Sequence, residues 1–341
     1  MTAKSRRFAW PRPDRFTMAL VVTVLLASLL PARGGFAPVV DMIGHAAVIL
    51  LFFLHGAMLP REAVVESLGH WRLHLMVLAS TFLLFPLIGL ALGPLSGRLI
   101  EPDLYTGILF LCCLPSTVQS SIAFTAIARG NVPVAICAAS ASNLIGIVLT
   151  PLLTGLLLAR QSGVSLDAVG SIVGTILLPF AVGQMLHTRI GAWLKARKPL
   201  TSLVDRGSIL IMVYAAFGKA VIEGIWHMVS LGDLIVLTIL CALILAVVMV
   251  VLRQTARAAR LSRADEIALF FCGSKKSLVS GVPMASVLFP GAAAGAIVLP
   301  LMIFHQIQLI VCAVIARAYE RRAIAEQQPP PPAMDSGRAG A

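Results

Sequence analysis

The chain has 341 residues, of which 58% are hydrophobic and only 12% are charged, and its formal net charge is +12. Soluble domains carry about 25% charged residues, so this composition excludes a water-soluble globular protein and indicates a membrane protein with several spans. Basic residues between apolar segments are typical of orientation signals and of contacts with anionic lipid, so nucleic acid is not expected as a partner.

Ten apolar segments approach or exceed the length needed to cross a hydrocarbon core about 30 Å thick. In chain order they are residues 16–30, 39–58, 73–92, 104–127, 132–158, 166–186, 208–221, 234–252, 267–288 and 291–316. The first and seventh are short for a complete crossing, which leaves nine spans open as an alternative. Ten spans would place both termini on the same side of the membrane.

The lysines and arginines are distributed unevenly between the two sides of these segments. With the N-terminus inside, 21 of the 27 fall in cytoplasmic segments. The exceptions are Arg33, Arg98 and Arg160 on the opposite side and Lys219, Lys275 and Lys276 inside spans. The positive-inside rule therefore predicts that both termini are cytoplasmic.

The ten segments divide into two halves of similar length. A basic cytoplasmic N-terminus at 1–15 precedes a first five-helix repeat at 16–158, and a second repeat at 166–316 precedes a tail at 317–341. An odd number of spans per half reverses the orientation of the second half, which is the plan of inverted-repeat transporters. The tail, in which four prolines follow Gln327 and Gln328, is expected to be disordered and cytoplasmic.

Two connections are predicted in more detail. Residues 187–207 are expected to form the longest cytoplasmic connection, which is basic. Arg129-Gly130-Asn131 is expected to make a tight turn between the fourth and fifth spans. Gly130 or Asn131 can supply the left-handed backbone that such a turn needs.

The fourth and ninth spans, which hold the same position in the two halves, each become polar partway across. The polar stretches are Pro115-Ser116-Thr117-Val118-Gln119-Ser120-Ser121 in the fourth span and Ser274-Lys275-Lys276-Ser277 in the ninth. Interrupted spans in matching positions predict discontinuous helices beside a midplane binding site. At such a site, half-helix N-termini can meet anions and freed carbonyls can meet cations.

Lys275 and Lys276 lie near the middle of the ninth span. A charge at that depth costs about 3 kcal/mol on insertion scales, so such residues usually face a cavity or a partner. Snorkelling to the headgroups is the alternative. It fits poorly, because about eight span residues precede the pair and about twelve follow it.

The fifth span adds Ser140, Ser142 and Asn143 to the candidate site, although helix packing explains these small and polar residues nearly as well. All six cysteines fall inside spans, where packing is their expected role, and their spacing indicates neither a disulfide framework nor a metal site. His55 and His305 are interpreted as interhelical hydrogen-bonding residues, with a proton relay as the alternative.

Three motifs in the chain resemble a known family. They are residues 114–121 continuing through Ala128-Arg129-Gly130-Asn131-Val132, residues 140–144, and residues 271–278. Over nearly its whole length the chain is similar to the SBF-like branch of the bile acid:sodium symporter superfamily, which includes the bacterial YfeH-type proteins. The resemblance implies ten helices, with a panel of spans 1, 2, 6 and 7 moving against a core of spans 3–5 and 8–10. It also implies that the discontinuous fourth and ninth helices cross beside the substrate and ion sites.

The sequence departs from the sodium-coupled members of that superfamily at their ion ligands. Aligned on Gly273, those ligand positions hold Phe271 and Lys275 in the ninth span, Ser121 and Ile122 in the fourth, and Ala135 and Ala139 in the fifth. An ammonium group has one positive charge and three donors, so Lys275 or Lys276 is expected to replace a bound sodium ion. A proton is then favoured over sodium as the coupling ion.

These observations predict an all-α secondary active transporter that moves a small organic anion across the bacterial inner membrane by alternating access. The expected substrate- and ion-binding residues are Lys275, Lys276, Ser274, Ser277, Gln119, Ser120, Ser121, Ser116, Thr117, Ser140, Ser142 and Asn143. The alternative is a regulatory membrane protein that moves no solute and affects calcium homeostasis. An enzyme is not expected, because no span carries a catalytic pair or a zinc motif. The expected partners are the lipid bilayer, the anion and the coupling ion, without a cofactor or metal, and the sequence leaves the oligomeric state open.

Overall fold

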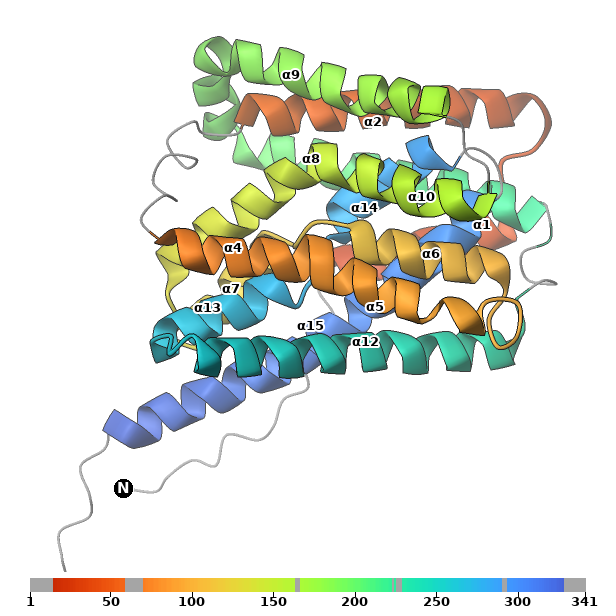
Figure 1. Ribbon diagram of the computed structural model, residues 1–341. Coiled ribbons are helices and arrows are strands. Elements are labelled where there is room, and N and C mark those ends of the chain that lie inside the picture. Colours follow the sequence, from red (N-terminus) through yellow and green to blue (C-terminus); the bar gives the residue numbers. More distant parts are fainter. Residues whose placement is uncertain are drawn as a thin grey trace, which may run out of the picture.

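The computed structural model describes residues 15–58, 70–162, 166–222, 224, 229–289 and 293–327. Over these residues the fold is helical, with one isolated β-bridge between Ser96 and Ile100. Helices α2 (Ala37–Met58) and α9 (Leu166–Ala196) lie along one edge of the bundle, and α12 (Leu231–Ala258) lies along the opposite edge (Figure 1). The predicted all-α class is confirmed.

The remaining helices connect these edges. They are α1 (Arg15–Leu29), α4 (Trp71–Ala79), α5 (Phe85–Ala91), α6 (Pro102–Cys113), α7 (Gln119–Ile127), α8 (Val132–Ser162), α10 (Lys198–Ile222), α13 (Arg263–Gly273), α14 (Leu278–Leu288) and α15 (Ala293–Gln327). A π-helical turn, η3 (Ser80–Leu84), joins α4 to α5, and the short 3-10 turns η1 (Gly34–Phe36) and η4 (Gly93–Leu95) precede α2 and follow α5. Turns of the π type inside helices are frequent at functional sites.

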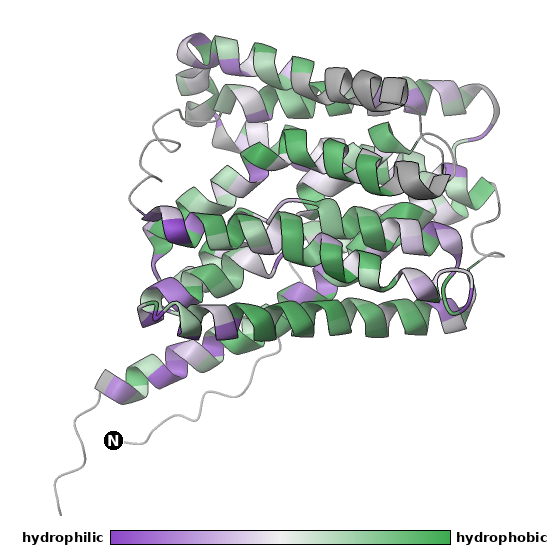
Figure 2. Ribbon diagram, viewed as in Figure 1, coloured by the Kyte–Doolittle hydropathy of each residue, from purple (hydrophilic) through white to green (hydrophobic). Residues whose placement is uncertain are grey.

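Several of these helical segments are suited to a membrane. Among the described residues, six are long and apolar enough to cross one: Gly34–Met58, Trp71–Leu95, Val132–Leu157, Pro199–Ile222, Leu231–Ala258 and Ala294–Glu326. The fourth and ninth predicted spans are not in this set because each is divided into two short helices, α6 with α7 and α13 with α14. Hydrophobic residues run along most helices and hydrophilic residues gather near helix ends (Figure 2). Large apolar side chains such as Leu29, Met185 and Leu231 are exposed, which suits contact with lipid.

Glycines allow α2 and α9 to pack backbone against backbone. A Cβ atom on Gly56 would lie 2.1 Å from the carbonyl oxygen of Phe180, and one on Gly183 would lie 2.1 Å from that of Phe53. No side chain fits at such a distance, so these contacts require glycine. The two helices therefore form one closely joined layer.

The segment predicted as a cytoplasmic connection, residues 187–207, is helical over almost all of its length. α9 continues to Ala196 and α10 begins at Lys198, so only Arg197 separates them. Pro199 is compatible with this arrangement because proline is tolerated in the first turn of a helix. The seventh predicted span, which looked short, is thereby extended to the 25 residues of α10.

The predicted turn between the fourth and fifth spans is present, but a different residue is left-handed. Arg129, with φ of 59°, takes that conformation in place of Gly130 or Asn131. Glycine is needed at position 130 for a different reason. A Cβ atom there would lie 2.4 Å from Cγ2 of Ile267, so a larger residue would clash with that side chain. Asn131 accepts the backbone N–H of Val134 at the start of α8 and donates to Asp265 at 2.8 Å.

The predicted disordered tail begins too early, since α15 continues to Gln327 and residues 317–327 are helical. This stretch holds neither glycine nor proline to end a helix. It extends past the rest of the bundle (Figure 1), and Arg263 at the start of α13 forms an ion pair with Glu326 near its end. The rest of the predicted tail, and residues 1–14 of the predicted basic N-terminus, lie outside the described residues.

Candidate functional site

The two interrupted helices meet at their breaks. Residues 114–118 separate α6 from α7, and residues 274–277 separate α13 from α14. The backbone N–H of Ser277 donates to the carbonyl of Pro115 at 2.9 Å, which joins one break directly to the other. Both interruptions predicted from the sequence are therefore present, and they form a single junction.

Hydroxyl groups from elsewhere in the bundle satisfy the carbonyls at the ends of the two half-helices. On α13, Cys272 accepts from the hydroxyl of Ser116, Phe271 from Ser121 at 3.0 Å, and Gly273 from Ser80 at 2.8 Å. On α6, Cys113 accepts from Thr150 at 2.8 Å. An unsatisfied carbonyl inside a membrane protein costs several kcal/mol, so these hydroxyls stabilise the junction.

The Lys276 ammonium lies at the centre of this junction. Its Nζ donates to three backbone carbonyls, those of Thr81 at 2.8 Å, Cys112 at 2.8 Å and Leu114 at 2.7 Å. Thr81 belongs to the π-helical turn η3, and Cys112 and Leu114 lie at the C-terminal end of α6, where carbonyls carry partial negative charge. The ring of Phe85 lies beneath the ammonium at 4.1 Å. All three donors are thus satisfied, as a metal cation would be by the same oxygens.

The side chain of Gln308 on α15 holds the backbone of Lys276. Its carbonyl oxygen accepts the N–H of Lys276 at 2.9 Å, and its amide nitrogen donates to the carbonyl of the same residue at 2.9 Å. That nitrogen also lies 3.0 Å from Nδ1 of His305. Gln308 was not among the residues predicted from the sequence, although an amide side chain within a predicted span is a usable signal.

Lys275 occupies a different environment from its neighbour. Its Nζ lies 4.1 Å from the centre of the Phe124 ring and 5.4 Å from that of Phe271, and it makes no hydrogen bond to the described residues. Both lysines are 0% exposed. The sequence grouped them as one charge centre, whereas one ammonium is held by carbonyls and the other by aromatic rings.

Most of the other predicted residues lie around the junction. Ser142 accepts the backbone N–H of Ser116 at 3.1 Å, and Asn143 accepts the hydroxyl of Ser280 at 2.7 Å. Ser277 caps α14 by accepting the backbone N–H of Ser280 at 3.2 Å. Thr117 and Ser120 share a hydrogen bond through their hydroxyls. The three that remain differ in exposure, with Gln119 exposed, Ser140 half-buried and Ser274 buried.

One cavity of about 170 Å³ lies beside the first break, between α2, α8 and α9. Its lining includes His55, Val118, Ser140, Asn143 and Phe180, and we call it the α8 cavity. Of the predicted site residues, Ser140 and Asn143 line it, whereas Lys275 and Lys276 do not.

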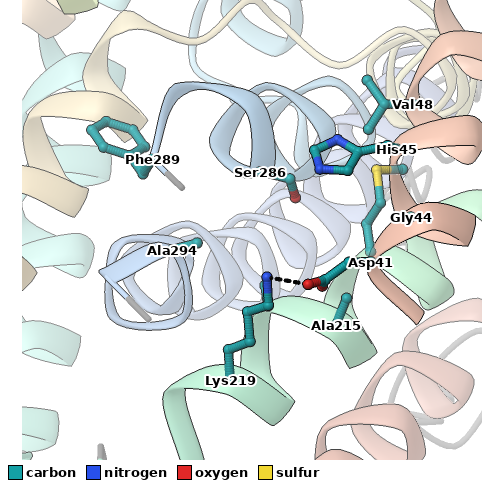
Figure 3. A pocket seen from close by; sticks show the side chains of 11 residues that line it. Asp41, Gly44, His45, Val48, Ala215, Lys219, Ser286, Phe289 and Ala294 are labelled. Atoms are coloured by element: carbon teal, nitrogen blue, oxygen red, sulfur yellow. Dashed lines mark ion pairs between the residues drawn. The ribbon is translucent and has the colours of Figure 1, made fainter. Parts of the chain in front are cut away.

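A second cavity of about 90 Å³ lies between α2, α10 and the C-terminal end of α14. Its charged residues are Asp41 and Lys219, whose side chains form an ion pair at 2.7 Å (Figure 3), and we call it the α10 cavity. His45 and Ser286 also line it. The sequence placed Lys219 inside a span but gave it no role, and no pattern linked it to Asp41, which lies far away along the chain.

An all-helical membrane protein whose two interrupted helices meet at their breaks has the architecture of a secondary transporter. The chain belongs to the SBF-like CPA transporter family, whose family model matches residues 14–321. The family predicted from the sequence motifs is thus confirmed.

Relatives in bacteria and animals cover nearly the whole chain. Uncharacterized protein PA2026 of Pseudomonas aeruginosa is 55% identical over 312 residues, which are 91% of this chain and 94% of the relative. The YfeH protein of Escherichia coli, whose name gives symport as its suggested activity, is 51% identical over 310 residues, or 91% of this chain and 93% of the relative. Sodium/bile acid cotransporter 7 of Rattus norvegicus is 28% identical over 324 residues, or 93% of this chain and 95% of the relative.

Proposed function

We propose that this protein is a secondary active transporter that moves a small organic anion across the bacterial inner membrane by alternating access. Membership of a transporter family supports the class, and bacterial relatives support the location. The likeness to a protein named sodium/bile acid cotransporter 7 supports an organic anion as the solute. The observation that carries the proposal is the junction of the two interrupted helices around the Lys276 ammonium.

The positions of the two cavities support a movement of one group of helices against the other. In the proposed ten-span, inverted-repeat arrangement, α1, α2, α9 and α10 form the panel and the other helices form the core. His55 in the α8 cavity and Asp41 in the α10 cavity are 14 residues apart on α2, which is about 20 Å along a helix. Each cavity lies between panel and core, near an opposite end of α2. Sliding the panel along the core would open one cavity while it closes the other.

In this proposal the α8 cavity binds the solute from one side of the membrane. Asn143 and Ser140 supply polar groups to the cavity. Val118, which also lines it, is the N-cap residue of α7, and no side chain caps this helix end. Uncapped N–H groups at a helix N-terminus favour an anion. Gln119, Ser120 and Thr117 would add donors at the same helix end, while Ser116, Ser121, Ser142 and Ser277 position the breaks through their hydrogen bonds.

Lys276 takes the part of a permanently bound cation in this proposal. A sodium ion bound by the carbonyls of Thr81, Cys112 and Leu114 would need the oxygens that the ammonium already occupies. It would also lie beside a like charge in a region of low dielectric, where repulsion is strong. We therefore expect the coupling ion to be a proton rather than sodium.

Solute flux into proteoliposomes tests the function. A thermal-shift screen of organic anions selects the carboxylate that stabilises the purified protein most, and its radiolabelled form is then used for uptake and counterflow. Asn143→Ala should reduce uptake about tenfold, because it removes an amide from the cavity wall. The control Ser28→Ala, on α1 and outside the linings of both cavities, should transport normally. Binding without uptake or counterflow would contradict a transporter and favour a regulatory protein.

A further inference from the structure

The α10 cavity brings together three titratable side chains within the proposed spans. Asp41 and His45 project from α2 one helical turn apart, Lys219 projects from α10, and the hydroxyl of Ser286 on α14 approaches from the core (Figure 3). The other lining residues are glycine, alanine, valine, methionine and phenylalanine, which do not titrate. Polar groups converging in a cavity with otherwise apolar walls are typical of a small-molecule site.

Of the three lysines predicted to lie within spans, Lys219 is the one that a solute can reach. Its side chain is 39% exposed and that of Asp41 is 33% exposed, whereas Lys275 and Lys276 are both 0% exposed. The three donors of Lys276 are already used by carbonyls, and Lys275 is buried against the rings of Phe124 and Phe271. An anion that enters the bundle can therefore pair with Lys219 without dismantling the junction of the interrupted helices.

Asp41 holds the position that such an anion would take. The ion pair is neutral as it stands, so a solute carboxylate that pairs with Lys219 leaves Asp41 as a second negative charge close by. Two negative charges a few ångströms apart repel each other, and a proton on one of them relieves the repulsion. A proton on Asp41 removes the repulsion and leaves the cavity with the same net charge as before.

Two further titratable groups on the neighbouring helices lie elsewhere. On α9, His187 contacts Ala57 near the opposite end of α2, and on α15 His305 contacts Gln308 at the junction. His45 is the other candidate proton acceptor within the lining. Glu223 follows Lys219 by four positions in the sequence and lies outside the described residues, so it is included as a control below.

We infer that the α10 cavity binds the anionic group of the solute on Lys219, and that one proton enters with each anion to neutralise Asp41. In this exchange the Lys219–Asp41 ion pair breaks, an ion pair between Lys219 and the solute forms, and the proton from solution binds the Asp41 carboxylate. Lys219 keeps its own proton throughout. The inference rests on the proposed function, because it gives that transporter its second solute site and its proton coupling.

Calorimetry on the purified full chain measures both parts of the inference. Acetate, benzoate and methanesulfonate are titrated near neutral pH in buffers of different ionisation enthalpy, so that the number of protons taken up per anion is obtained. The unaltered protein should take up one proton per bound anion. D41N should bind the anion without proton uptake, whereas H45Q and E223Q should each retain one proton.

Affinity variants complete the test. K219Q should bind about tenfold more weakly or worse, and K219R should retain binding because its charge remains. If K219Q folds poorly, the double variant D41N/K219Q removes both charges together and should bind about tenfold more weakly than D41N, in which Lys219 is intact. Proton uptake retained in D41N, proton-coupled binding of unaltered affinity in K219Q, equal affinities of the double variant and D41N, or binding of none of the three anions to the unaltered protein would overturn the inference.

Uptake measurements separate the failure of this inference from the failure of the proposed function. Normal transport by K219Q would reject the site and leave the transporter intact. Binding with one proton per anion but without flux would reject the transporter and leave the site intact.

Discussion

Two adjacent lysines in the second break have different partners, and this difference predicts unequal effects of mutation on stability. Lys276 donates to three backbone carbonyls, while Lys275 contacts aromatic rings and no hydrogen-bond acceptor among the described residues. Removing a donor leaves its buried acceptors without a hydrogen bond, whereas removing a buried charge that has no acceptor relieves a desolvation cost.

Lys276→Met should therefore lower the free energy of unfolding by roughly 3 kcal/mol, and Lys275→Met should change it by less than about 1 kcal/mol. Thermal and denaturant unfolding in detergent, followed in parallel for the two variants, measures the difference. Equal destabilisation by both substitutions would show that the carbonyl contacts of Lys276 are not what stabilises the junction.

Shortening Lys276 to alanine should convert the junction into a sodium site, because three carbonyl oxygens are suitable ligands for a small cation. We expect sodium chloride, compared with choline chloride at equal ionic strength, to raise the melting temperature of Lys276→Ala but not that of the unaltered protein. A matching sodium effect on the unaltered protein would mean that a sodium site exists beside the ammonium.

At the scale of helices, the sequence predicted the interruptions but not what holds them. Pro115 with its polar neighbours, and the lysine pair between apolar flanks, are local signals of a broken span. The acceptors for Lys276 are backbone carbonyls, which every residue has, so no residue type marked Thr81, Cys112 or Leu114.

The contact between α2 and α9 predicts a steric effect at Gly183. Gly183→Ala places a Cβ atom 2.1 Å from the carbonyl oxygen of Phe53, which forces the helices apart, and should cost about 3 kcal/mol or abolish folding. Gly207→Ala on α10 is the matched control, because a Cβ there meets nothing within 4 Å and should be neutral or stabilise by up to about 1 kcal/mol. The folded fraction after detergent extraction, measured by size-exclusion chromatography, compares the two. Equal yields would show that α2 and α9 can separate freely.

At the scale of the whole molecule, composition was sufficient for the all-α membrane class, and the motifs were sufficient for the family. The α10 cavity was not predictable, since Asp41 and Lys219 become neighbours only when α2 packs on α10. The length of the seventh span was underestimated for a different reason. A hydropathy pattern ends where polar residues begin, whereas the helix α10 continues through them back to Lys198.

The distribution of basic residues predicts the orientation of the whole chain. In cells whose native cysteines are replaced, a single cysteine at Ser336 or Ser202 should be shielded from an impermeant thiol reagent, and one at Ser162 should react. Membranes opened with detergent provide the control for reactivity at all three positions. Labelling of Ser336 with protection of Ser162 would reverse the proposed orientation.

In the proposed mechanism, a fixed ammonium replaces sodium in a transporter of small organic anions. Uptake of the selected carboxylate into proteoliposomes, measured with an inward sodium gradient and again with choline at the same pH and ionic strength, tests this claim most directly. We predict equal initial rates in the two media, together with acceleration by an inward proton gradient. Uptake that requires the sodium gradient would contradict the account.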